Sequence, residues 1–569
     1  MPSPHSAPPS IDAPAETSRP GETHRPGWAS ALGRAFAARP WLWCWLAAAL
    51  LAIFQHGPMP MYSTRTLSVA WEMWVRHSFA VPYLNGLPYS DKPPLLLWLI
   101  HLGWLIGGVG DVWPRLLEVA LGAIQLLLVA RLAERLFPEH PQVARTAPWI
   151  AAAFSFGFLF GLQVMYEVLL ADCVLAALLC LTPTPQRASP RWIGFALAVG
   201  LGLLSKGPVM WLHVAFPWLL GPWWNRWARR ERSRWYGTGL LALLAGSLLL
   251  LGWVALATWT GGESYRQKLV VHQTAGRVVD AFAHAAPFWW YLPLLPVLIF
   301  PFALWPRAWV ALGLLRGPLD TGLRFVLAWI VPVFVAFSLI SGKQPYYLLP
   351  EFGGFALLIA AALARFEHPW HARRWLGPWP LALLCAVTAV ALVVLEYMAR
   401  HGKVADRELA TLGTWGVPFG VLFAGFAIAL MVRRWRELQR IALIGLMATV
   451  AAHALFTVTL WPAYDFSPIA RRLAQAEAGG SPIANLESND GQYTFLGRLR
   501  EPVTQLRGLD AVRHWSTEHP DGLVITYPRE LSAADRAHAV YIQPFRGIWV
   551  AIWPVSDYVA AREHQQLRD

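Results

Sequence analysis

The stretch YSDKPPLLLWLI, residues 89–100, places an acid, a base and two prolines directly against an apolar run. In a water-soluble protein this arrangement would be a turn before a buried core helix. In a membrane protein it would place a charged pair at the mouth of a hydrophobic segment. The composition of the rest of the chain separates the two interpretations.

The whole chain is too apolar for a water-soluble protein. Of its 569 residues, 56% are hydrophobic and only 14% are charged, whereas charged residues make up about 25% of typical soluble domains. Uncharged runs near 20 residues recur, and each can cross a hydrocarbon core about 30 Å thick. The runs are continuous rather than alternating, which excludes a transmembrane β-barrel. We therefore expect a polytopic α-helical membrane protein.

Fourteen apolar runs follow one another along the chain. They lie at about 41–55, 94–110, 114–136, 147–163, 169–183, 192–205, 207–223, 237–259, 287–306, 323–341, 346–364, 377–397, 415–432 and 440–461. From the third run onward, arginine clusters fall at every second connection, and such clusters mark the cytoplasmic side. This alternation holds only if 94–110 does not cross the membrane. We expect 94–110 to be a helix in the outer interface, leaving about thirteen transmembrane helices.

The chain divides into three parts by composition. Residues 1–38 are rich in Pro, Ser, Ala and Arg and are expected to form a disordered cytoplasmic tail. Residues 39–462 form the transmembrane domain, in which the first periplasmic loop is 56–113. Residues 463–569 are mixed and polar, and we expect a small periplasmic α/β domain. Its β-rich runs are PIANLE (482–487), LVITY (523–527), AVYIQ (539–543) and GIWVAIW (547–553).

Basic residues give the chain a net charge of +13. Their clustering between apolar runs is explained by the positive-inside bias, so we expect membrane lipids and not nucleic acid as partners. Only five basic residues are lysines, and all fall on the outer side: Lys92, Lys206, Lys268, Lys343 and Lys403. Basic residues on the disfavoured side need another explanation. The four cysteines all lie in apolar runs and indicate buried packing residues rather than disulfides or metal ligands.

No soluble-enzyme motif is present: the sequence lacks a P-loop, a GxGxxG after a strand, HExxH and GxSxG. Five outer segments carry the informative pattern instead. They are YLNGLPYSDKPPLLLWL (83–99), YEVLLAD (166–172), LSKGP (204–208), HQTAGRVVDAFAHAAPFWWYLP (272–293) and SGKQPYYLLP (341–350).

In this order the segments resemble the bacterial membrane glycosyltransferases that use a polyprenyl-phosphate sugar. This superfamily includes the protein O-mannosyltransferases and the lipid A aminoarabinose transferase, and it has the GT-C fold. The resemblance covers residues 41–365 and extends more loosely over the C-terminal domain. It implies a fold with outer interfacial helices and an active site facing the periplasm.

The resemblance also implies roles for individual residues. In the family's reaction a lipid phosphate leaves the anomeric carbon of a sugar and gains negative charge, which fixed cations stabilise. By family position the donor-phosphate site comprises Arg65, Lys92, Lys206, Arg277, Lys343 and the hydroxyl of Tyr347. The catalytic carboxylates implied are Asp91 and Asp172. No cofactor or metal-ligand set is implied, and a role for a divalent cation stays open.

The first loop departs from the family pattern. The family's loop opens with Asp-Glu-x-Arg-Tyr, whereas this chain has YSTRT at 62–66. Arg65 keeps its register, but Tyr62 stands where the family has its presumed catalytic acid. Either Asp91 or Asp172 does the work of that acid, or the reaction needs no such base, or activity is lost. A hydroxyl acceptor would need a carboxylate base, whereas a phosphate acceptor is already ionised.

Simpler structural roles remain open for the same residues. Asp91 and Lys92 would also suit a surface ion pair at a helix start, and Asp172 would suit a helix cap. Lys206 could extend its ammonium to the membrane surface from an apolar position, and Arg277 could be a solvated loop charge.

The function expected is that of an enzyme at the outer face of a bacterial inner membrane. It would transfer a hexosyl or pentosyl group from undecaprenyl phosphate to lipid A or lipopolysaccharide. A protein O-glycosyltransferase is the first alternative. A non-catalytic protein that binds or transports lipid-linked sugars on the same fold is the second.

Overall fold

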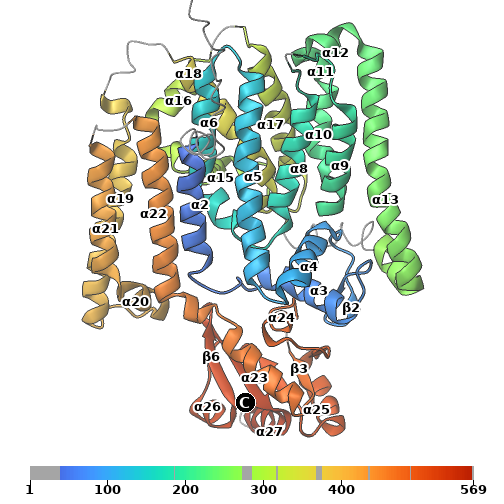
Figure 1. Ribbon diagram of the computed structural model, residues 1–569. Coiled ribbons are helices and arrows are strands. Elements are labelled where there is room, and N and C mark those ends of the chain that lie inside the picture. Colours follow the sequence, from blue (N-terminus) through green and yellow to red (C-terminus); the bar gives the residue numbers. More distant parts are fainter. Residues whose placement is uncertain are drawn as a thin grey trace, which may run out of the picture.

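The computed structural model describes residues 39–184, 186–271, 285–315, 318–366, 374–432, 436–486 and 489–566. Figure 1 shows a bundle of roughly aligned helices with a small domain of strands and helices at one end. This confirms the expected fold class, a polytopic α-helical membrane protein with a C-terminal α/β domain. Arg277 lies outside the described residues.

Helix length and composition identify the segments that could cross a membrane. Among the described residues six qualify: α5 (Val112–Leu136), the part of α13 at Arg232–Glu263, α17 (Thr321–Leu339), Pro345–Ala364, α19 (Trp379–Arg400) and α22 (Glu437–Thr459). Two bent pairs raise this to eight: α6 (Pro141–Ala153) with α7 (Ser155–Gly161), and α20 (Arg407–Gly413) with α21 (Gly416–Met431). Helix length alone therefore accounts for six to eight of the thirteen crossings expected.

Shorter apolar helices complete the bundle: α2 (Pro40–Ile53), α4 (Leu95–Gly107), α9 (Trp192–Lys206) and α10 (Val209–Leu219). Proline occupies the first helical position of α2, where its missing N–H costs nothing. The helix α9 ends at Lys206 because Gly207 takes a φ of 80°, a backbone angle that residues other than glycine rarely adopt. This glycine therefore leaves Lys206 at the carboxyl end of the helix.

The centre of the bundle is α8 (Tyr166–Leu181), which packs against α5, α9 and α10. Figure 1 shows α8 between α5 and the α9–α10 pair. Nearly every residue of α8 is buried, so its sequence is apolar on all sides rather than amphipathic. Acidic residues on this helix therefore lie in protein and not in lipid.

The first outer loop folds into α3 (Ser63–Val75), a two-stranded hairpin and α4. The hairpin pairs β1 (Tyr83–Leu84) with β2 (Leu87–Pro88), and its turn residues Asn85 and Gly86 both have positive φ, as a type I′ turn requires. Glu72 accepts the N–H groups of Asn85 and Gly86 at 2.5 and 2.8 Å, and burial raises the pKa of its carboxyl group. The expected helix at 94–110 is α4, which lies at the same end of the bundle as the C-terminal domain (Figure 1).

The C-terminal domain contains a five-stranded mixed sheet in the order β4-β3-β5-β7-β6. Its strands are β3 (Ile483–Asn485), β4 (Thr504–Gln505), β5 (Leu523–Thr526), β6 (Tyr541–Phe545) and β7 (Ile548–Pro554). The four strands expected from β-rich runs are confirmed, whereas the two-residue β4 was not expected. The larger helices are α23 (Ser467–Ala478), α25 (Gly508–Glu518) and α27 (Val555–Gln566).

The C-terminal domain is fastened to α3 by hydrogen bonds between side chains and backbone. The Ser68 hydroxyl donates to Gly491 O at 2.7 Å and accepts the Phe495 N–H at 3.0 Å. The Trp71 indole donates to Leu499 O at 2.8 Å, and Asn85 bonds both backbone groups of Val503. The outer loop and the C-terminal domain therefore form one continuous packed surface.

Candidate active site

A buried ion pair joins the start of α8 to the end of α9. The Lys206 ammonium lies 2.8 Å from the Glu167 carboxylate, and the two side chains are only 9% and 5% exposed. Glu167 lies in the first turn of α8, and Lys206 is the last residue of α9. The negative charge therefore lies at the positive end of one helix dipole, and the positive charge at the negative end of the other. Two buried charges need such pairing, because an isolated one is very costly to remove from water.

Aromatic rings surround the same lysine. The Lys206 ammonium lies 4.8 Å from the ring centre of Tyr347 and 5.8 Å from that of Tyr346, within the range of cation–π attraction. Both tyrosines belong to the 3-10 segment η3 (Pro345–Glu351). Tyr346 also meets the ring of Tyr62 edge to face at 6.3 Å. Tyr62, Lys206 and Tyr347, which are far apart in the sequence, therefore share one neighbourhood.

A second ion pair links α3 with the C-terminal domain. An Arg65 Nη2 lies 3.3 Å from an Asp490 carboxylate oxygen, and the two side chains are 36% and 34% exposed. The Nε of Arg65 is buried and has no hydrogen-bond partner among the described residues. The guanidinium therefore keeps hydrogen-bonding capacity that the pair does not use.

Tyr89 connects the two ion pairs with the acid of the opening stretch. Burial raises the pKa of Tyr89, the negative charge of Asp91 raises it further, and Arg65 opposes them. The negative charges of Asp490 and Glu167 also raise the pKa of the Tyr89 hydroxyl. The charges of Asp91, Arg65, Asp490 and Glu167 therefore all act on the hydroxyl of Tyr89, whose side chain is half-buried.

The two expected catalytic acids occupy different environments. Asp91 is exposed and Lys92 half-buried, both immediately before α4. Asp172 is buried in α8, and neither of its carboxylate oxygens has a hydrogen-bond partner among the described residues. It stands five residues beyond Glu167, about 7.5 Å deeper along the helix axis. Glu167, rather than Asp172, is the α8 carboxylate that meets a cation of the site.

Lys343 is engaged by backbone carbonyls. Its ammonium donates to Ala286 O and Ile340 O at 2.7 and 2.6 Å, with Ser341 O at 3.5 Å. These three acceptors match the three donors of an ammonium, so here Lys343 braces the turn that precedes η3. A role in phosphate binding would require it to exchange one of these carbonyls for the lipid.

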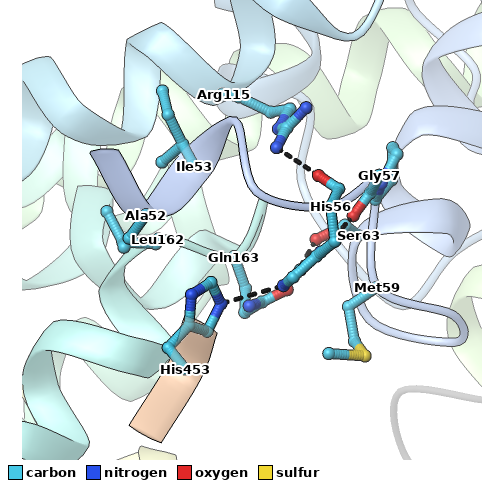
Figure 2. A pocket seen from close by; sticks show the side chains of 11 residues that line it. Ala52, Ile53, His56, Gly57, Met59, Ser63, Arg115, Leu162, Gln163 and His453 are labelled. Carbon is cyan, nitrogen blue, oxygen red and sulfur yellow. Dashed lines mark hydrogen bonds between the residues drawn. The ribbon is translucent and has the colours of Figure 1, made fainter. Parts of the chain in front are cut away.

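Beside the start of α3 lies a small polar cavity of about 20 Å³ (Figure 2), enough for one water molecule. His56 and His453 meet across it, with their Nε2 atoms 2.9 Å apart. The Ser63 hydroxyl faces Gln163 at 3.1 Å, and Arg115 donates to His56 O at 2.5 Å. Burial lowers the pKa of His56.

Neither the cavity nor the rest of the described chain forms a metal centre. Among the described residues no three His, Cys, Asp or Glu side chains are grouped so that they could hold a metal ion. A cation that takes part in the reaction would therefore need ligands from the substrates or from residues outside that set.

Sequence reasoning missed four residues of this region: Tyr89, Glu167, Tyr346 and Asp490. The first three lie inside the quoted motifs, and the acid at the amino end of YEVLLAD is a signal that could have indicated Glu167. Asp490 has no such signal, because it reaches Arg65 only through the docking of a separate domain.

Comparisons with known proteins identify similar sequences. The family model described as dolichyl-phosphate-mannose-protein mannosyltransferase matches residues 91–251. An undecaprenyl phosphate-alpha-4-amino-4-deoxy-L-arabinose arabinosyl transferase of Pseudomonas aeruginosa (strain PAO1) is 30% identical over 64% of this chain and 67% of its own length. The enzyme named arabinosyl transferase 2 of Pseudomonas fluorescens (strain Pf0-1) is 29% identical over 84% of this chain and 86% of its own.

Solved structures show the same fold. The crystal structure of ArnT from Cupriavidus metallidurans bound to undecaprenyl phosphate superposes with a TM-score of 0.68 and 19% identity, covering 90% of this chain and 98% of that one. The apo state of the same protein gives a TM-score of 0.69, with 18% identity over 93% and 99% of the two chains. The chain therefore belongs to the GT-C family of membrane glycosyltransferases that use polyprenyl-phosphate sugars.

Proposed function

We propose that the protein transfers 4-amino-4-deoxy-L-arabinose from undecaprenyl phosphate to lipid A or lipopolysaccharide at the periplasmic face of the bacterial inner membrane. The supporting observation is the group of cations and tyrosines at one end of the bundle, in a chain that matches an arabinosyl transferase over 84% of its length. The names of these relatives include this donor, and this chain has the basic residues Arg65 and Lys206 in the group described above.

The outer residues suit the departure of a lipid phosphate. As the bond to the anomeric carbon breaks, negative charge grows on the phosphate, and preorganised cations stabilise it more than they stabilise the bound donor. Arg65 offers a planar fork for a phosphate, and Lys92 offers a point charge. Lys206 already forms an ion pair with Glu167, so the pair adds no net positive charge to the site. Lys206 would contribute through the orientation of its ammonium group.

The carboxylates distinguish between acceptors. Position 62 is a tyrosine packed against Tyr346, and it cannot act as a strong base at neutral pH. A phosphate of lipid A arrives ionised and needs positioning more than deprotonation. A serine or threonine hydroxyl of a protein would need Asp91 or Asp172 as its base. The tyrosine at position 62 therefore favours lipid A as the acceptor. A protein acceptor is the second candidate.

The test uses purified protein in detergent or nanodiscs, with isotope-labelled donor and lipid A as acceptor. We expect labelled lipid A by mass spectrometry, and loss of transfer in Lys92→Ala and Arg277→Ala at unchanged membrane abundance. Lys403→Ala, which changes an exposed lysine after α19, is the matched control. Wild-type transfer by both site variants would place the phosphate site elsewhere. Retention of the donor lipid without turnover would instead indicate a binding or transport protein.

Two further arms complete the experiment. A peptide acceptor in place of lipid A tests the protein alternative. Added EDTA tests whether a divalent cation takes part in transfer.

A further inference from the structure

The Arg65–Asp490 pair crosses the boundary between the membrane bundle and the C-terminal domain. Arg65 lies in the first turn of α3, three residues after Tyr62, which directly precedes the helix. Tyr62 carries no carboxylate, and the acid that meets Arg65 comes instead from the segment between β3 and α24 (Thr494–Gly497), with 3.3 Å between the two charged groups.

The segment that carries Asp490 is held on both sides. Gly491 has a φ of 79°, and a Cβ built on it would stand 2.9 Å from the Ser68 Cβ, so only glycine fits without displacement. Its carbonyl accepts the Ser68 hydroxyl. On the other side, Asn489 donates to the Asn85 side chain at 3.0 Å. The Asp490 carboxylate is therefore presented to Arg65 by a docked loop and not by a free one.

The ion pair leaves part of the guanidinium available. Arginine carries five N–H donors in a fixed plane, and Asp490 meets Arg65 through one terminal nitrogen. The Nε is buried and has no partner among the described residues, so the donors open to a phosphate are the other terminal N–H groups of this side chain, which is 36% exposed. An arginine held by a carboxylate at one edge can meet a phosphate at another, and it has less rotamer freedom to lose on binding.

We propose that Asp490 is a positioning residue of the donor site: it orients Arg65 for the phosphate of the polyprenyl donor. The inference rests on the proposed function and deepens it, because it makes donor binding depend on the docked C-terminal domain. Asp490 acts through Arg65 and takes no part in bond making or breaking.

The test compares Asp490→Asn, Asp490→Glu and Arg65→Ala, with Asp490→Asn also made in the Arg65→Ala background. Transfer kinetics are measured with undecaprenyl-phosphate aminoarabinose and lipid A. We expect Asp490→Asn to raise the KM for the donor about fivefold to tenfold, in the range of coupling between residues in contact, with less change in kcat. Glutamate should restore part of the loss. In the Arg65→Ala background Asp490→Asn should add nothing.

The control variant is Asp510→Asn on α25, which removes a solvent-exposed acid of the same domain. An unchanged donor KM in Asp490→Asn would overturn the inference. A lowered KM would also overturn it, because Asp490 would then compete with the phosphate for Arg65. So would an equal loss in the presence and absence of Arg65, which would mean a general effect on folding.

Binding of undecaprenyl phosphate by native mass spectrometry separates this inference from the proposed function. A wild-type protein that neither binds the lipid nor transfers sugar would overturn both. Binding that does not change in Asp490→Asn or in Arg65→Ala would overturn the inference alone.

Discussion

The two ion pairs at the outer end of the molecule differ in burial. Glu167–Lys206 lies inside the bundle between neighbouring helices, whereas Arg65–Asp490 joins α3 to a separate domain and is about a third exposed. A buried pair that loses one partner leaves an uncompensated charge in a medium of low dielectric. An exposed pair is largely replaced by water. The difference teaches that the first pair contributes strongly to the stability of the fold, whereas the second contributes little to it.

The largest effect on stability is expected from breaking the buried pair. Lys206→Met leaves Glu167 charged and enclosed, which should cost about 3–5 kcal/mol. Thermal unfolding in detergent, followed by tryptophan fluorescence, measures this. The double variant Glu167→Met/Lys206→Met removes both charges at similar volume and should recover most of the lost stability. A single variant that unfolds at the wild-type temperature would contradict the assignment of this pair to the fold.

The next effect concerns the loop that carries Asp490. Gly491→Ala forces a Cβ into left-handed backbone, which costs about 1–2 kcal/mol, and presses it against Ser68. Gly480→Ala is the matched control, because Gly480 has nearly the same φ of 78° with open space around its Cβ position. Limited proteolysis of the C-terminal domain should show faster cleavage for Gly491→Ala. Equal rates for both variants would show that the contact with Ser68 has no influence on docking.

A smaller effect is expected from pH, through the histidine pair in Figure 2. Burial lowers the pKa of His56 below its ordinary value of 6.5, against the opposing hydrogen bond to Gly57. Smaller contributions come from Arg115, which lowers the pKa further, and from Asp465, which raises it. The unfolded chain therefore takes up a proton at a higher pH than the folded one, and stability falls as pH drops below about 6.5. Unfolding temperatures at pH 7.5 and 5.5 measure this loss.

The variant His56→Gln should reduce that pH dependence, whereas His514→Gln, which changes an exposed histidine on α25, should not. A pH dependence that is unchanged in His56→Gln would assign the titration to other groups.

The smallest effect on stability is expected from Asp490→Asn. The exposed pair contributes under about 1 kcal/mol, so the unfolding temperature should change little while the donor KM rises. This outcome sharpens the comparison, because Lys206→Met should show the opposite order of effects. A large drop in the unfolding temperature of Asp490→Asn would show that both ion pairs contribute strongly to the stability of the fold.

Hydropathy and charge predicted the overall fold because they depend on local composition. They identified the helical membrane class, the helix at 94–110 and four strands of the C-terminal sheet. They could not place side chains around a helix. Glu167 and Asp172 lie in one motif, but residues five apart point about 140° away from each other, so only the structure shows that Glu167 meets Lys206.

The site was predicted in part for a similar reason. Lys206 contacts the ring of Tyr347 and Arg65 pairs with Asp490. The roles of these residues in phosphate binding stay predictions, as does that of Arg277, which lies outside the described residues. Lys343 was grouped with them by its motif, but its donors meet three carbonyls. The position of Asp490 depends on a contact between Gly491 and Ser68, which no local pattern encodes.

The docking of the C-terminal domain on α3 also has a consequence for the order in which the protein is made. The segment holding Arg65 emerges from the ribosome early, whereas Asp490 follows after α22, the last helix long enough to cross the membrane in the described chain. A nascent chain halted before the C-terminal domain would carry Arg65 without its carboxylate partner. Under the role proposed for Asp490, the arginine would reach its final orientation only after the C-terminal domain has been made and has docked on α3.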